Sequence, residues 1–219
     1  MGILVILKYR KKKQYIYVWW GIGLLGIGLP WAGCAFSFLF IVLTGEGLTA
    51  RPYFFVMTFW MAITLFFWMW TMTDLMAKKK QKIILSFYAI TGIIFEIYFV
   101  YILIIDPSVI GVIQTPPLDS NYHGITMFYT IFGLISISLS LFLFIRVSLK
   151  VENLDVKLKA KILLIAMISY IFGAILDAYL TLTILTIFIT RIILISSAIE
   201  FYIGWILPEP VKKLLLKNI

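Results

Sequence analysis

Six stretches of the chain are mainly apolar, and each is long enough to cross a lipid bilayer as a helix, which takes about 20 residues. They are continuous apolar runs and lack the alternation of apolar and polar residues that marks membrane-barrel strands. The sequence therefore predicts an all-α fold, a polytopic transmembrane helical bundle, with one domain over residues 1–219. The six predicted spans cover about residues 17–43, 53–75, 83–105, 125–146, 162–183 and 185–207.

The composition excludes a water-soluble fold. Hydrophobic residues make up 63% of the chain and charged residues 13%, and the mean hydropathy is +1.05. A soluble domain is about 45–50% apolar and about 25% charged, so a chain of 219 residues could not bury the excess. We expect an integral membrane protein, with the lipid bilayer as its first partner.

Basic residues gather in alternate connections between the spans. Of the 19 Lys and Arg residues, 17 lie before the first span, between the second and third, between the fourth and fifth, or after the sixth. Arg51 lies in the opposite set of loops and Arg191 lies within a span. The positive-inside rule then predicts a multi-pass protein of the cell membrane with both termini in the cytoplasm. Because the net charge of +9 follows from this bias and from contact with anionic lipid, no nucleic acid partner is expected.

The N-terminal segment, "MGILVILKYRKKK", is apolar from Ile3 to Leu7 and then basic. It is too short to span a membrane, and it lacks the charge-first order and the cleavage site of a signal peptide. It is similar to the last two turns of a membrane helix that runs into the cytoplasm. Two interpretations stay open: a segment at the interface, or the end of an upstream seventh helix, which would place the N-terminus outside.

Two cytoplasmic segments are also expected to be helical. The inner loop from Arg146 to Lys161 mixes both signs of charge and should continue the flanking helices. The C-terminal "PEPVKKLLLKNI" is short and amphipathic, which predicts a small interfacial helix with its lysines toward anionic lipid.

Residues 20–31, "WGIGLLGIGLPW", contain the glycine spacing of a dinucleotide-binding turn. That motif needs a strand before it and an acidic residue about 20 residues after it. Here the preceding stretch is basic and then aromatic, and the glycines lie in an uncharged apolar run, so no nucleotide is expected. Pro30 predicts a kink that neighbouring helices tolerate. Four glycines are instead predicted to pack the first span against a neighbouring helix or a second copy: Gly21, Gly23, Gly26 and Gly28.

The sequence contains few residues that could catalyse a reaction or hold a cofactor. The single cysteine, Cys34, lies in a predicted span and is expected to be an apolar filler. The single histidine, His123, lies in an outer loop without partners at metal-ligand spacing. The last two spans contain no lysine that could hold retinal as a Schiff base, and hydrolase, protease and phosphate-loop motifs are absent. We therefore expect no enzyme, no metal site and no cofactor.

Charged residues inside a membrane are costly and are candidates for function. Asp177 and Arg191 lie seven residues to either side of the midpoint of the turn between the last two spans. Antiparallel helices bring both to the same depth, roughly 10 Å below the outer boundary, and Glu96 in the third span lies roughly 13 Å deep. We expect an Asp177–Arg191 ion pair, with Glu96 adjacent if the third span neighbours this hairpin. Such an intramembrane charge cluster would suit a proton- or ligand-sensitive site; a structural pair that fixes hairpin register is the alternative.

The last third of the chain begins "KAKILLIAMISYIFGAILDAYL" at Lys159 and ends "GWILPEPVKKLL". Its basic entry, the segment from Gly173 to Asp177, Arg191 and this exit resemble the closing helices of uncharacterised archaeal multi-span membrane proteins. They are also similar to the seven-helix sensor domain of prokaryotic histidine kinases. That family usually carries seven helices and a cytoplasmic output domain, whereas this sequence shows six complete spans and no recognisable output domain. The resemblance implies a sensor that acts through a separate protein.

These patterns together predict a non-enzymatic membrane sensor or scaffold that couples to a separate partner. The alternative is a transporter or channel subunit with a polar intramembrane site. A transporter needs a water-accessible route past the outer-half charges, whereas a sensor can keep them sealed. Beyond lipid, the expected partner is another membrane protein or a second copy of the chain.

Overall fold

The computed structural model describes residues 2–115, 117–179 and 184–216. Within these ranges, six helical segments are long and apolar enough to cross a membrane, which confirms the all-α, polytopic fold. The segments are Ile16–Thr44, Ala50–Met76, Lys78–Ile105, Gly124–Ser148, Leu154–Asp177 and Leu185–Ile206. The chain divides into two compact units, residues 1–137 and 138–219. Helix α7 (Gly124–Ser148) continues from the first unit into the second.

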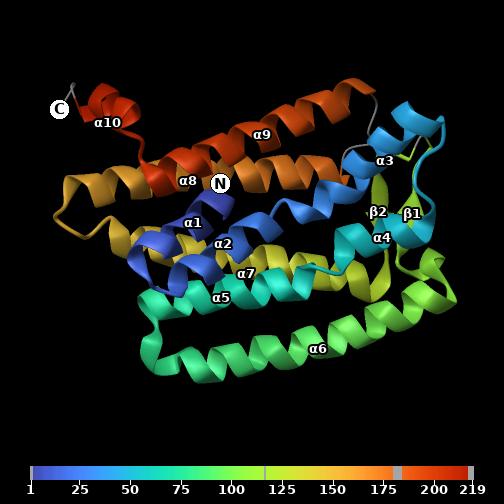
Figure 1. Cartoon of the computed structure of the whole chain (residues 1–219), viewed down its shortest axis with the longest axis horizontal. Coiled ribbons are helices and arrows are strands. Elements are labelled where there is room, and N and C mark those ends of the chain that lie inside the picture. Colours follow the sequence, from blue (N-terminus) through green and yellow to red (C-terminus); the bar gives the residue numbers. More distant parts are fainter. Residues whose placement is uncertain (1, 116, 180–183, 217–219) are drawn as a thin grey trace. The chain divides into compact units, whose positions relative to one another are not determined.

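Helix α5 (Met61–Met76) lies at the centre of the first unit. It packs against α2 (Ile16–Gly26) and against α6 (Gln81–Ile105), as Figure 1 shows. Trp68 and Met72 of α5 are each only 1% exposed, as expected for an apolar helix with neighbours on more than one side. The prediction of a single domain over the whole chain stays a prediction, and the two units are described separately.

The first span is interrupted in its middle. Helix α2 is followed by the 3₁₀ turn η1 (Leu29–Trp31) and then by α3 (Ala32–Thr44). Pro30 lies in η1, where its missing amide and its ring prevent a continuous α-helix. The kink predicted at this proline is therefore present as a short irregular turn between two helical segments.

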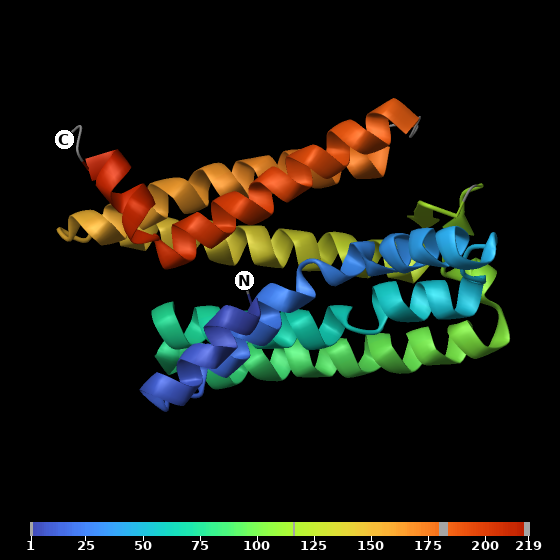
Figure 2. The ribbon, with the colours of Figure 1, turned by 45° about the horizontal axis from the view of Figure 1, so that its top comes forward.

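The second span is interrupted as well. Helix α4 (Ala50–Thr58) and α5 are separated by two residues in a turn, and Figure 2 shows this connection in cyan and the one between α2 and α3 in blue. Gly26 contacts Thr64 on one side of the two interruptions, and Gly33 contacts Met57 on the other. The interruptions in the two neighbouring spans therefore lie opposite each other.

Helix α1 (Gly2–Lys12) lies beside α2 and runs in the opposite direction. A Cβ added at Gly2 would lie 2.5 Å from the carbonyl oxygen of Gly21 and from Cγ of Leu25, and one added at Gly21 would lie 2.3 Å from Cγ1 of Ile6. The backbones of α1 and α2 are therefore closer than any larger residue would allow. Both interpretations of this N-terminal segment stay open.

A short hairpin follows α6 and the turn η3 (Pro107–Val109). Strands β1 (Gly111–Ile113) and β2 (Ser120–Tyr122) pair antiparallel. Ile110, which is fully buried, anchors the hairpin to a core formed by residues of α4, α5 and α6. We call the end of the first unit that carries this hairpin the hairpin end, and the opposite end, with the turn η2 (Lys78–Lys80), the lysine end.

The second unit contains α8 (Leu154–Tyr179), α9 (Ile184–Ile206) and the end of α7. Only residues 149–153 separate α7 from α8, so the inner loop does continue the flanking helices. Gly204 contacts Leu163, which allows α8 and α9 to approach closely. Residues 181–183 of the predicted turn at 181–186 lie outside the described residues, and 184–186 belong to the start of α9. Helix α10 (Glu209–Leu216) forms the predicted C-terminal helix.

Candidate intramembrane sites

Asp177 and Arg191 form the predicted ion pair. The guanidinium of Arg191 donates to Oδ2 of Asp177 over 3.0 Å, and the two side chains are 24% and 14% exposed respectively. The pairing follows from the packing of α8 against α9, which brings these two positions together. A charged pair of this kind lowers the cost of placing either group within the membrane.

A glycine one turn from Asp177 sets the distance between the two helices. A Cβ added at Gly173 would lie 3.0 Å from Cδ2 of Leu194 and 3.1 Å from Cγ2 of Ile193. Gly173 and Asp177 lie four residues apart and so share one face of α8. The small residue allows close helix packing, and this brings Asp177 within reach of Arg191.

The structure shows one part of the predicted cluster of three charges, the Asp177–Arg191 pair. Glu96 belongs to α6 in the first unit, whereas Asp177 and Arg191 belong to the second unit. The structure therefore brings together Asp177 and Arg191, and the adjacency of Glu96 stays a prediction. Glu96 instead has surroundings of its own within the first unit.

The carboxyl group of Glu96 lies against the beginning of α5. Both of its oxygens are buried, and within the described residues neither makes a hydrogen bond of ordinary geometry. The backbone amide of Ala62 faces the carboxyl without reaching that geometry. Ala62 is the second residue of α5, so its N–H is among those that lack a partner inside the helix. The positive end of the α5 dipole is thus directed toward an acidic group.

Gly92 and Tyr129 complete these surroundings. A Cβ added at Gly92 would lie 3.3 Å from Cβ of Ala62 and 3.7 Å from Oη of Tyr129, so this glycine keeps α6 close to α5 and α7. The Tyr129 ring stacks on Phe95 with 3.8 Å between centroids. Its buried hydroxyl lies within electrostatic reach of Glu96 and makes no hydrogen bond within the described residues. We call Glu96, Ala62, Gly92 and Tyr129 the Glu96 site.

Helix α7 adds further hydroxyl groups over the beginning of α5. Thr130 lies 3.7 Å from Sδ of Met61, the first residue of α5, and donates to the carbonyl oxygen of Thr126 over 2.8 Å. The hydroxyl of Thr126 is itself fully buried and has no hydrogen-bond partner in the described part of the chain. The interruption between α4 and α5 therefore faces polar side chains from α7 as well as from α6.

The hairpin is tied to the other side of the same interruption. Thr58, the last residue of α4, donates a hydrogen bond from its hydroxyl to Oη of Tyr122 over 3.2 Å. Burial raises the pKa of the Tyr122 phenol above its usual range. Nearby, the thiol of Cys34 lies 3.2 Å from Oη of Tyr53. Cys34 therefore packs against the core, and it also takes part in a polar contact that the sequence did not predict.

Three of the four predicted packing glycines contact another helix. Gly21 lies against Ile6 of α1, whereas Gly23 and Gly26 lie against α5. Gly28 differs, because the only atom outside its own neighbourhood within 4 Å of an added Cβ is the carbonyl oxygen of Leu25. Gly28 lies at the start of η1, where the helix has already ended, so the structure gives it no close helix contact.

Other polar residues of the predicted spans have local partners. Asp74 pairs with Lys78 one turn later, at the lysine end. Ser196 donates to Oε1 of Glu200 over 3.0 Å. His123 is exposed, as predicted for a loop residue. No group of three metal-ligating side chains gathers anywhere in residues 2–115, 117–179 and 184–216.

Sequence reasoning identified Glu96 as a candidate but missed its actual neighbours. Ala62 and Tyr129 carry no signal of a site on their own, because an alanine and a tyrosine are ordinary residues of an apolar span. Their role depends on the interruption after Thr58, where the sequence contains neither proline nor glycine. The available hints were four polar residues within predicted spans: Tyr129, Thr58, Thr126 and Thr130.

The fold and the buried charges define the class of the protein: a multi-pass α-helical membrane protein with ionisable groups inside its spans. Comparisons with family models, curated proteins and solved structures found no match. The Glu96 site and the Asp177–Arg191 pair are the intramembrane features that bear on its function.

Proposed function

We propose that the protein is a non-enzymatic membrane sensor in which a change of charge on Glu96 is passed to a separate partner. The observation that carries this proposal is the buried Glu96 carboxyl facing the amide of Ala62 at the start of α5. An ionised carboxyl is attracted by the positive end of the α5 dipole, whereas a protonated one is not. The charge on Glu96 therefore controls how firmly α5 is held at its interruption.

The protein with an ionised Glu96 and the protein with a protonated Glu96 differ in the conformation of the junction between α4 and α5. A buried carboxylate without strong hydrogen bonds is costly, so the gain or loss of a proton shifts the balance between conformations of this junction. Helix α5 runs from the junction to the lysine end, where Asp74 pairs with Lys78. In the predicted orientation this end is cytoplasmic, which is where a separate partner would receive the signal.

The burial of the Glu96 carboxyl favours a sensor over a transporter. Both oxygens of Glu96 are buried. Glu96 lines neither of two surface hollows, one with Arg51 and Leu103 at the hairpin end and one with Tyr15 and Asp74 at the lysine end. A buried carboxyl of this kind, which changes its charge by gaining or losing a proton, fits a proton sensor.

A transporter is the second candidate, and one observation favours it. Interrupted helices whose ends point at an ionisable group inside the membrane are a recurring feature of secondary transporters. Here the interruptions of the first two spans lie opposite each other, with Gly26 against Thr64 and Gly33 against Met57. Proton movement across the membrane would distinguish this candidate from a sensor.

Infrared spectroscopy of the protein in lipid nanodiscs tests the proposal. We expect a carbonyl band of a protonated carboxyl that changes with pH in the wild type and is lost in Glu96→Gln. Glu46→Gln, at an exposed loop position, is the matched control and should leave that band unchanged. Tryptophan fluorescence should change over the same pH range in the wild type, and Trp60→Phe should reduce this change because Trp60 lies at the interruption.

Two outcomes would contradict the sensor. A carboxyl band that is identical in Glu96→Gln would show that Glu96 does not titrate. Proton flux into liposomes that depends on Glu96 would replace the sensor by the transporter.

A further inference from the structure

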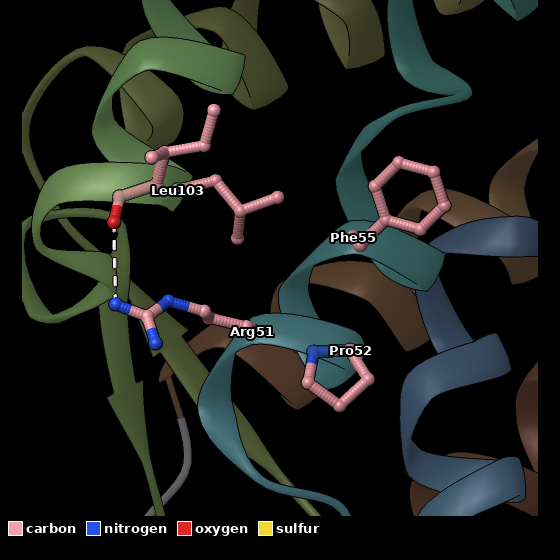
Figure 3. A pocket seen from close by; sticks show the side chains of 5 residues that line it. Arg51, Pro52, Phe55 and Leu103 are labelled. Carbon is pink, nitrogen blue, oxygen red and sulfur yellow. Dashed lines mark hydrogen bonds between the residues drawn. The ribbon is translucent and has the colours of Figure 1, made fainter.

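The hairpin end of the first unit carries an open groove between α4 and the end of α6. Figure 3 shows Arg51, Pro52 and Phe55 on one side and Leu103 on the other, and Ile104 also lines the groove. Phe55 is 41% exposed and Ile104 is 65% exposed, although both lie in helices apolar enough to cross a membrane. The walls of the groove are therefore apolar and face the region that lipid chains occupy.

Arg51 places a positive charge at the mouth of this groove. Its guanidinium donates one hydrogen bond, from Nη2 to the carbonyl oxygen of Ile104 over 3.2 Å. A guanidinium carries five N–H donors, and among the described residues Arg51 forms no ion pair. Most of its donors are therefore available to another molecule.

Asp106 is the acidic residue closest in sequence to Ile104, but it does not form an ion pair with Arg51. The carboxyl of Asp106 instead accepts hydrogen bonds from the amide and the hydroxyl of Ser108, over 3.0 and 2.7 Å. These bonds lower the pKa of Asp106, which keeps that carboxyl ionised and engaged with Ser108. The charge of Arg51 is left for an anion that approaches from outside the chain.

We propose that this groove binds one glycerophospholipid, with the lipid phosphate on Arg51 and an acyl chain against Phe55 and Ile104. A guanidinium matches phosphate oxygens in a two-bond arrangement, and the apolar walls continue from the guanidinium into the membrane-spanning region. A soluble phosphate would meet the charge but gain nothing from those walls. Charge complementarity and the apolar surface beside it therefore favour a lipid of the leaflet at the hairpin end, which is the outer leaflet in the predicted orientation.

The test measures lipid binding to the purified full chain in detergent by native mass spectrometry. The probes are phosphatidylglycerol, a diacylglycerol with the same acyl chains, and inorganic phosphate. We expect one phosphatidylglycerol to be retained, with little retention of diacylglycerol and no competition from millimolar-range phosphate. Arg51→Gln should weaken retention about tenfold, the equivalent of one charge-assisted interaction.

Three variants separate the lipid site from a general loss of structure. Arg51→Lys keeps the charge but loses the two-bond geometry, so retention should be intermediate. Phe55→Ala leaves Arg51 and its bond to Ile104 in place, yet should also weaken retention because it removes an apolar wall. Lys150→Gln makes the same charge change at an exposed position that does not line the groove and should have no effect.

Each other outcome overturns the proposal. Equal retention of diacylglycerol would show that the groove binds acyl chains and does not recognise the phosphate. Displacement of the lipid by inorganic phosphate would show a free-anion site. Retention that is unchanged in both Arg51→Gln and Phe55→Ala would place the bound lipid elsewhere.

Discussion

Arg191 donates a hydrogen bond to Oδ2 of Asp177 over 3.0 Å, and the two residues belong to neighbouring antiparallel helices. The bond joins α8 and α9 close to the last residue of α8, Tyr179. Since neither side chain is more than 24% exposed, removal of one partner takes this ion pair away from a largely buried charge within the membrane.

The single variants Asp177→Asn and Arg191→Gln should therefore each be less stable than the double variant. The loss in each single variant should be about 2–3 kcal/mol, the scale of a charged group within a span. Thermal unfolding in nanodiscs measures it. Losses that simply add in the double variant would show that the two residues are not coupled. If any response to pH or ligand survives intact in the double variant, the pair serves the fold alone.

Replacement of Gly26 by leucine should destabilise the first unit. A Cβ at this position would lie 1.8 Å from Oγ1 of Thr64, so α2 and α5 would have to separate. We expect a loss of about 1–3 kcal/mol, as is usual for overpacking. Thermal unfolding in detergent is the measurement, and Gly28→Leu is the control because only the carbonyl of Leu25 lies near that position. Equal effects of the two changes would refute the role of Gly26 in packing.

The bond between Thr58 and Tyr122 should make stability depend on alkaline pH. Because burial raises the pKa of Tyr122, the contribution of its phenol is fully present below the ordinary tyrosine pKa of about 10 and is lost as the pH rises through the higher folded value. Tyr122→Phe should cost about 1 kcal/mol at neutral pH and should remove this alkaline loss. Thermal unfolding from pH 7 upward compares the two, and an alkaline loss that persists in Tyr122→Phe would assign it to another group.

The contact of Lys212 with Asp155 should hold α10 against the start of α8. Lys212 donates to Oδ2 of Asp155 over 2.5 Å, and this hydrogen bond raises the pKa of Lys212. The attachment is therefore complete below the usual lysine pKa of about 10.4 and is lost as the pH rises through the higher value. Asp155→Asn should speed hydrogen exchange in α10 at neutral pH, while Glu152→Gln, at an exposed neighbouring position, should not. Unchanged exchange in Asp155→Asn would mean that α10 is held by other contacts.

The orientation predicted from basic residues can be tested with reporter fusions. Fusions at Asn121 in the hairpin and at Ile219 should report opposite sides of the membrane, because 17 of 19 basic residues lie on one predicted side. Reports from the same side would rule out six spans in this arrangement.

The sequence was sufficient for features that depend on spacing along one helix or one hairpin. The apolar runs predicted the six spans, and the spacing of Asp177 and Arg191 on either side of the predicted turn predicted the ion pair. Pro30 marked the interruption of the first span, since a proline cannot donate the helical hydrogen bond.

The Glu96 site could not be predicted because it depends on contacts between helices. The interruption after Thr58 occurs in a sequence without a helix-breaking residue, so tertiary contacts must favour it. Only the three-dimensional structure shows that Glu96, Ala62 and Tyr129 meet at this point. Gly28 illustrates the same limit. Its position in the sequence continued the series of packing glycines, but among the described residues it contacts no other helix.

The interrupted second span also constrains how the protein is made. Helix α4 has nine residues, about 14 Å at 1.5 Å per residue, which is less than half of the roughly 30 Å hydrocarbon layer. It cannot enter the bilayer as an independent insertion unit, so Ala50–Met76 must leave the insertion machinery as one segment. Irregular backbone is tolerated at membrane depth only when protein covers it. The bend after Thr58 therefore needs the first span beside it, because η1 packs against α4 and α2 packs against α5.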